Sequence, residues 1–511
     1  MSGVKEQGRR NGFFDRTNAD QLKGKSVRGG AVTLISQGLK FVLGMGSTMI
    51  LARQLTPADF GLQGMVLAIT GVIGLFGDIG LSMATVQSDS ITHEQTSTLF
   101  WINVALGSAL AVLVALLAPV LIDFYQEPRL LWMTIGAAAT FFIGGLGVQH
   151  SALLVREMRF VALAKIQILS LIVSAAVGIG MAAFGFGYVA LIGNMVAAPV
   201  ITVACLWFAV RWIPGMPCRG YGLRSALHFG GILTLGNLVV YLGYNAEKVL
   251  LGRFWGAAAL GLYGKAYSLV NLPTTQLHSS IYTVVFPALS RLQADRQRLN
   301  NSFLQVYTAV VALSIPATIC CMLFAEEMIR IALGPKWNGA VPIFRLLGPT
   351  VLAFGMINPF GWFLMSTGRV VRSLKMSLVI APLVITAILL GLNYGPNGVA
   401  LSYSVVMTLL TVPMIIWAVH GTGITFADIM RAIKPPALAG LFAAVAGLVF
   451  KTALEGELSP ILILILGLAL VLGLYAWILL MVMGQKDFFA DLTRHMFQRN
   501  QPDTGKRPDI S

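Results

Sequence analysis

The chain has 511 residues and a formal net charge of +15, with 56% hydrophobic and only 11% charged residues. A mean hydropathy of +0.78 excludes an ordinary soluble globular protein. Uncharged stretches such as 97–121 and 460–483 are long enough to cross a hydrocarbon core of about 30 Å as helices that rise about 1.5 Å per residue. The sequence therefore predicts an all-α, polytopic membrane protein.

Residues 1–28 form a polar, basic N-terminal tail without an apolar run. Hydropathy and turn residues then predict about fourteen transmembrane helices and a polar C-terminal tail. The predicted helices are 31–52, 60–85, 97–122, 130–152, 164–184, 187–210, 226–251, 257–285, 303–325, 340–366, 374–393, 398–419, 434–451 and 459–484. The short connections leave no room for a folded soluble domain, so the function is expected to lie within or between the helices.

The distribution of Lys and Arg residues along the chain follows the predicted membrane topology. With the N-terminus in the cytoplasm, most of the 36 Lys and Arg residues fall in or beside cytoplasmic segments, as the positive-inside rule requires. Both termini are therefore expected in the cytoplasm. A basic stripe with interleaved aromatic residues is lacking, so nucleic acid is not an expected partner. The four cysteines show no ligand spacing, and no metal site is predicted.

An internal repeat links two helix-to-helix turns. LARQLTPADFGLQG from Leu51 aligns without a gap with LGRFWGAAALGLYG from Leu251, at a constant offset of 200 residues. Arg53 matches Arg253, and Gly61 matches Gly261. Coincidence between two glycine-rich hairpins is the alternative, but both segments join an outgoing helix to an ingoing one. The match favours a duplicated architecture.

Because each repeat contains six helices, both copies point the same way across the membrane. We expect two six-helix lobes related by a pseudo-twofold axis along the membrane normal, and two extra C-terminal helices. The predicted divisions are a cytoplasmic tail (1–28), an N-lobe (29–212), a C-lobe (213–425), the added helix pair (426–485) and a cytoplasmic tail (486–511).

Seven segments together resemble a known family. They are LARQLTPADFGLQGMV from Leu51, FGDIGLSMATVQ from Phe76, QTSTLFWINVALG from Gln95, REMRFVALAKI from Arg156, KVLLGRFWGAAALGLYGKAYSLVNLP from Lys248, VVFPALSRLQAD from Val284 and GPKWNGAVPIFRLLG from Gly334. From residue 30 to about 485, the chain resembles the Wzx-type polysaccharide flippases of the multidrug, oligosaccharidyl-lipid and polysaccharide exporter superfamily, in the branch of the colanic acid exporter.

The resemblance implies a function in the bacterial inner membrane. It implies that the lobes open alternately to the cytoplasm and the periplasm and carry an undecaprenyl-pyrophosphate-linked oligosaccharide outward for exopolysaccharide, capsule or O-antigen assembly. Its implied partners are this lipid-linked substrate, membrane lipids, and the polysaccharide polymerase and export proteins. The added helix pair would border a groove for the lipid tail.

Charged residues inside the predicted helices are the candidate substrate ligands, because an unpaired charge there costs about 2.5–3.5 kcal/mol even on insertion scales. Lys40 is expected either to bind pyrophosphate or to pair with Asp78. Arg53 and Arg253 either bind phosphate or acidic sugars at the outer mouth or cap their helices.

A second group of candidates lies in the C-lobe. Lys248 is expected to face the cavity as a cation, and Glu247 is either a titratable switch or the ion-pair partner of Lys265. Arg345 either binds substrate or extends to the surface. His278 is the repeat counterpart of Asp78, so the two are candidates for proton or cation coupling or for structural hydrogen bonds.

Two other transporter classes remain as alternatives: a proton- or sodium-coupled small-molecule (multidrug) antiporter of the same superfamily, and a peptidoglycan-precursor flippase. No phosphate-cradling loop or large outer domain with catalytic residues is present, so neither an ATP-driven transporter nor an enzyme is predicted. No cofactor is expected. Proton or sodium coupling, or membrane potential alone, would supply the energy.

Overall fold

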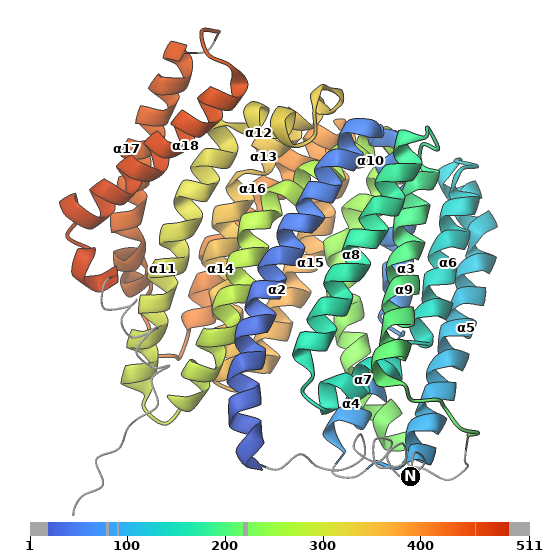
Figure 1. Ribbon diagram of the computed structural model, residues 1–511. Coiled ribbons are helices and arrows are strands. Elements are labelled where there is room, and N and C mark those ends of the chain that lie inside the picture. The colour runs from blue at the N-terminus through green and yellow to red at the C-terminus, as the bar shows by residue number, and fades with distance from the viewer. Residues whose placement is uncertain (1–18, 78–80, 89–90, 218–222, 455, 490–511) are drawn as a thin grey trace, which may run out of the picture. The chain divides into compact units, whose positions relative to one another are not determined.

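The computed structural model describes residues 19–77, 81–88, 91–217, 223–454 and 456–489. These ranges contain helices and no β-strand, so the predicted all-α fold is confirmed (Figure 1). The chain divides into two compact units. The first comprises residues up to Gly264, with Ala332–Trp337 and Leu392–Pro396. The second comprises Lys265–Ile331, Asn338–Gly391 and the residues from Asn397 onward.

The first unit is built from helices that pack side by side. They are α2 (Ala19–Gln54), α3 (Pro57–Gly74), α4 (Leu81–Gln87), α5 (His93–Tyr125), α6 (Leu130–Gly145), α7 (Val148–Arg156), α8 (Phe160–Ala183), α9 (Val189–Val210) and the first part of α10 (Leu223–Arg291). In this unit α2 packs on α8, α8 on α9, and α5 on α6. The short helix η1 (Pro335–Trp337) also belongs to it.

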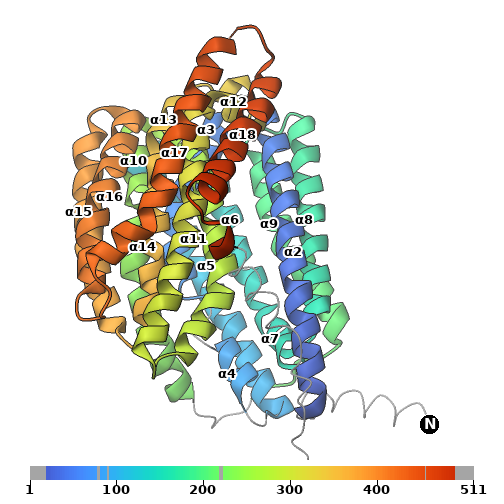
Figure 2. The same cartoon turned by 90° about the vertical axis from the view of Figure 1, so that its left-hand side faces the viewer.

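The second unit contains the rest of α10 and the C-terminal helices. They are α11 (Arg296–Leu323), α12 (Ala325–Ala332), α13 (Ala340–Leu347), α14 (Pro349–Ser366), α15 (Val370–Leu392), α16 (Gly395–Val419), α17 (Phe426–Leu454), α18 (Pro460–Trp477) and the π-helix η2 (Ile478–Val482). Helices α17 and α18 pack on each other, and both contact α11 (Figure 2).

Within the described ranges, 11 helices are long and apolar enough to cross a membrane, or 12 if the bent pair α6–α7 forms one span. A multi-pass membrane protein is thus confirmed, whereas the predicted number of fourteen is not. Helix α10 covers both predicted helices 226–251 and 257–285 and is not among these spans. Gly256, with φ of 79°, interrupts its helical backbone at the predicted turn.

Two helices predicted as continuous are broken. The predicted helix 60–85 ends at Gly74, where glycine recurs every third residue from Gly71 to Gly77, and α4 begins at Leu81. The predicted helix 130–152 bends by 43° between α6 and α7, where Gly144, Gly145 and Gly147 gather. Glycine destabilises a helix by about 1 kcal/mol relative to alanine, so both breaks fall where the helix is weakest.

Local sequence signals set the helix starts. Thr56 caps α3, and its side chain and that of Asp59 form a reciprocal capping box, followed by Pro57 at the first helical position. Thr92 and Gln95 form the same device at the start of α5. Each box satisfies backbone N–H groups that the helix leaves unpaired.

The repeat-related turns contact each other reciprocally inside the first unit. A Cβ atom placed on Gly61 would lie 1.7 Å from the carbonyl oxygen of Ala257. One placed on Gly261 would lie 1.8 Å from the carbonyl oxygen of Pro57. Because 57 and 257, like 61 and 261, differ by 200, the two contacts are the same contact seen from the two repeats. Such reciprocity is the mark of a twofold relation.

Candidate functional site

Lys40 lies on α2 and is directed toward α8. Its Nζ donates a hydrogen bond of 2.8 Å to Oε1 of Gln167. The lysine is half-buried and the glutamine is exposed on the surface of its unit. An ammonium and an amide inside transmembrane helices suit a water-filled cavity better than lipid. Because the amide is neutral, it does not cancel the charge of the lysine.

Lys248 is held by its own helix. Its Nζ donates to Oδ1 of Asn245 at 2.7 Å, and Nδ2 of Asn245 donates to the backbone oxygen of Tyr241 at 2.9 Å. The Tyr241 hydroxyl in turn donates to the backbone oxygen of Leu67 on α3 at 3.1 Å. This chain of hydrogen bonds fixes the lysine while using one of its three donors. The site again combines a cation with a neutral amide.

Glu247 lies next to Lys248 but is fully buried, with an exposed fraction of 1%. No hydrogen bond reaches either of its carboxylate oxygens from the part of the chain that the structure describes. A buried, unpaired carboxylate is costly when ionised, so this environment favours the uncharged carboxyl group. The predicted ion pair with Lys265 would join the two units and stays a prediction.

The two repeat-related arginines lie at helix ends and are exposed. The guanidinium of Arg253 lies 5.8 Å from the ring centroids of both Phe124 and Phe254. These cation–π contacts involve the faces of the guanidinium and leave the N–H groups at its edge available for hydrogen bonds. Arg53 lies in the last turn of α2, where its stem approaches Gly334. Both positions agree with anion binding and with helix capping.

The remaining candidates belong to the second unit or have side chains that lie outside the described residues. Lys265 is half-buried and Arg345 is exposed, and both belong to the second unit. Asp78 and the side chain of His278 lie outside the described residues, so the predicted Lys40–Asp78 pair and the predicted coupling sites remain predictions. Within the described residues, no group of His, Cys, Asp and Glu side chains is arranged to hold a metal ion.

Sequence reasoning missed the polar partners of the lysines. Asn245 could have been found, because it lies three residues before Lys248 and therefore on the same face of a helix. Gln167 could not, because only the packing of α2 on α8 brings it to Lys40. A similar buried pair, Lys451 with Glu327, was also missed; their closest N–O distance is 2.9 Å.

Comparisons with known proteins agree on one family. Residues 50–342 match the family described as "Polysaccharide biosynthesis protein". The lipopolysaccharide biosynthesis protein WzxC of Escherichia coli (strain K12) is 28% identical over 394 residues, which cover 76% of this chain and 80% of WzxC. The teichuronic acid biosynthesis protein TuaB of Bacillus subtilis (strain 168) is 30% identical over 305 residues, which cover 57% of this chain and 61% of TuaB.

Solved structures share the fold. The lipid II flippase MurJ in an inward closed conformation superposes with a TM-score of 0.71, over 92% of this chain and 100% of MurJ, at 13% identity. An inward-facing transporter of the multidrug resistance MATE family, which belongs to the MOP superfamily, gives a TM-score of 0.61 over 77% of this chain and 95% of its own. At such low identity the likeness establishes the fold alone.

Proposed function

Because this chain belongs to the polysaccharide biosynthesis protein family, we propose that it flips an undecaprenyl-pyrophosphate-linked oligosaccharide repeat unit from the cytoplasmic to the periplasmic leaflet of the bacterial inner membrane. The names of WzxC and TuaB connect relatives of this chain with bacterial envelope polysaccharides. The product would enter exopolysaccharide, capsule or O-antigen assembly, together with a polymerase and export proteins.

The single observation that carries the proposal is the pairing of intramembrane lysines with neutral amides. Lys40 bonds to Gln167, and Lys248 bonds to Asn245. Within the described residues neither lysine has a carboxylate within ion-pair distance. A structural lysine inside a membrane usually pairs with an acidic group, so we infer that these two bind an anionic ligand instead, which for Lys40 requires that Asp78 is not its partner. Pyrophosphate is the anionic part of the proposed substrate.

The glycine crossing suggests how access alternates. Gly61 and Gly261 bring the two repeat-related segments into backbone contact at the turns that the proposed orientation places on the periplasmic side. Such contact closes that side to a bulky sugar. Outward opening then requires these segments to separate, while the lysines offer the pyrophosphate the same cationic surroundings throughout.

Two energy sources fit this scheme. Moving a net negative charge out of a negative interior is favoured by about 2.3 kcal/mol per charge per 100 mV, so the membrane potential would contribute directly. Glu247 adds a carboxyl group that can take up or release a proton if a conformational change exposes it. Collapsing the potential and the pH gradient separately in vesicles distinguishes the two.

Glu247 is also the observation that favours a second candidate, a proton- or sodium-coupled small-molecule antiporter of the same superfamily. A cationic drug would be repelled by the two lysines, whereas a pyrophosphate would be attracted. A peptidoglycan-precursor flippase would share that attraction. Rescue of a strain that lacks its peptidoglycan-precursor flippase would support this last alternative.

Complementation tests the proposal in cells. A strain without its polysaccharide flippase receives the wild type, Lys40→Ala, Lys248→Ala or the double variant, and the carrier-linked oligosaccharide on the cytoplasmic face is measured. Loss of a hydrogen bond to a charged group costs about 1.5–3 kcal/mol, so each single variant should lower export roughly tenfold or more. Arg298→Gln, exposed in the second unit, is the control. Full export by the double variant would refute the pyrophosphate assignment.

A further inference from the structure

A second cationic site lies within the second unit, and none of the candidate transport residues lines it. The end of α14 and the starts of α11 and α15, together with the turn that follows α16, enclose a cavity of about 260 Å³. This is near the roughly 300 Å³ lower limit of pockets for drug-sized ligands, so it suits a small group. Its polar lining residues are Gln293, Arg296, Asn300, Thr367, Arg369 and Thr422.

Backbone contacts hold the walls of this cavity in place. Arg369 donates to the backbone oxygen of Gly421 at 2.7 Å, and Nδ2 of Asn300 donates to that of Thr422 at 3.1 Å. The side chain of Gln293 donates to the backbone oxygen of Ser366. Arg369 and Asn300 thereby fix the turn after α16 from two sides, so the lining is organised before any ligand arrives.

Arg296 is held differently. It is exposed at the first position of α11, and its side chain has no hydrogen bond or ion pair with any residue that the structure describes. The guanidinium therefore lines the cavity with its five N–H donors uncommitted.

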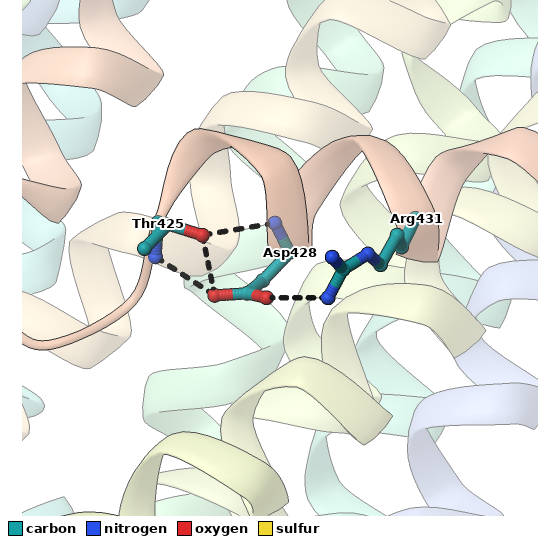
Figure 3. Close-up of polar contacts among 3 residues, drawn as sticks. All are labelled: Thr425, Asp428 and Arg431. Carbon is teal, nitrogen blue, oxygen red and sulfur yellow. Dashed lines mark hydrogen bonds and ion pairs between the residues drawn. The ribbon is translucent and has the colours of Figure 1, made fainter.

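The nearest carboxylates along the chain are already in use. Asp295 accepts a backbone hydrogen bond from Arg298 and forms an ion pair with its side chain at 3.1 Å. Asp428, at the start of α17, accepts from the Thr425 hydroxyl at 2.6 Å and pairs with Arg431 at 3.4 Å (Figure 3). Neither acidic group lines the cavity. Within the described residues, no ion pair joins a carboxylate to either of the two arginines that do line it.

The electrostatics at Arg369 agree with this arrangement. Its pKa lies below the ordinary value for arginine, first because of burial and then because of the neighbouring cations Arg372 and Arg296. Arg372 is turned away toward backbone oxygens at the end of α16, with its shortest bond, 2.6 Å, to His420. An anion between Arg296 and Arg369 would relieve the repulsion between the two.

We propose that this cavity binds a phosphate group, supplied by the headgroup of an anionic phospholipid or by a soluble phosphate compound. Guanidinium groups match phosphate geometry with paired N–H donors, and Thr367 and Asn300 add neutral hydrogen bonds. The site lies where transmembrane helices end, which is the level of the headgroups. It goes beyond the proposed function, because none of its residues belongs to the candidate transport site.

Native mass spectrometry and thermal unfolding of the full-length protein test this site. The protein is reconstituted with phosphatidylglycerol or with phosphatidylcholine, and retained lipid is counted after release. In phosphatidylcholine, the Tm is measured with increasing inorganic phosphate. The variants are Arg296→Gln, which breaks no internal bond, and Arg369→Gln, which also loosens the turn. Arg291→Gln, at the exposed end of α10 and outside the cavity lining, is the matched control.

A headgroup ligand predicts that the wild type and Arg291→Gln retain phosphatidylglycerol, and that Arg296→Gln retains roughly tenfold less, as expected when one charged hydrogen-bonding partner of phosphate is lost. A soluble ligand predicts instead that phosphate raises the Tm of the wild type and of Arg291→Gln but not of Arg296→Gln. If Arg296→Gln matches the wild type in both measurements, the proposal is wrong.

Discussion

Two buried glutamates, one in each unit, have opposite surroundings. Glu327 on α12 is 5% exposed and lies 2.9 Å from Nζ of Lys451, which also donates to the backbone oxygen of Leu323. Glu247 on α10 is 1% exposed, and neither of its oxygens has a hydrogen-bond partner among the described residues.

The difference distinguishes a charge with a structural role from a carboxyl group that we propose takes part in transport. The pair Lys451–Glu327 joins α17 to α12. The hydroxyl of Tyr475 on α18 donates a hydrogen bond to the backbone oxygen of Ala312 on α11. These contacts hold the two added helices in the second unit. Glu247 has no comparable contact among the described residues, and we propose that this carboxyl group changes its charge during transport.

The largest expected effect comes from breaking the satisfied pair. Lys451→Met leaves Glu327 buried without a counter-charge, which should lower the free energy of unfolding by about 3–5 kcal/mol. Thermal unfolding of the purified protein measures the loss. The double variant Lys451→Met/Glu327→Gln should recover most of it, because no buried charge remains. If Lys451→Met were as stable as the wild type, that result would contradict a structural role for the pair.

The glycine crossing should give the next largest effect. Gly61→Ala places a methyl group against the backbone of Ala257, and the overpacking should cost about 1–3 kcal/mol or force the two segments apart. Gly64→Ala, one turn later on α3, is the control, since its nearest neighbour would be at an ordinary 3.4 Å. The Tm and the labelling of cysteines placed at this turn report the two outcomes. Equal behaviour of both variants would contradict the close contact.

An exposed pair extends the comparison to charges in water. Glu127 lies in the loop between α5 and α6, and its hydrogen bond to Arg129 holds its pKa below the ordinary value. The pair therefore stabilises the fold above the ordinary glutamate pKa of about 4.3, and its contribution disappears as the pH falls through the lowered pKa. Exposed pairs contribute about 0–1 kcal/mol.

The stability of Glu127→Gln relative to the wild type should therefore differ by at most this amount at pH 7 and converge at low pH. A Tm series across pH makes the measurement. A difference that grows on acidification would have the wrong sign for a carboxylate stabilised in its charged form.

The smallest effect on stability is expected at Glu247. If its carboxyl group is uncharged in this conformation, Glu247→Gln should change the free energy of unfolding by less than about 1 kcal/mol. The transport rate of this variant should no longer depend on pH. Glu327→Gln should leave the pH dependence of transport unchanged. Strong destabilisation by Glu247→Gln would instead show that the carboxylate is charged and paired in the folded protein.

Hydropathy and the internal repeat predicted much of the fold. Apolar length predicted the helices of both units, and the 200-residue offset predicted the relation that the reciprocal contacts of Gly61 and Gly261 display. The helix breaks near Gly74 and Gly147 were missed, because hydropathy averages over a window and does not register where glycines weaken a helix.

The partners of the charged groups were harder to predict. Gln167 and Lys451 reach their partners through packing of helices that are distant in sequence, and no periodic pattern encodes which faces meet. The Arg296–Arg369 cavity depends on backbone oxygens of the turn after α16, which have no sequence signature at all.

Translocation in proteoliposomes tests the central claim most directly. Purified wild type and the double variant Lys40→Ala/Lys248→Ala are reconstituted with a fluorescent undecaprenyl-pyrophosphate oligosaccharide, and its appearance in the opposite leaflet is measured under an imposed membrane potential. The account predicts transport by the wild type and roughly a hundredfold slower transport by the double variant, since two charged contacts are lost. Equal transport by both proteins would contradict it.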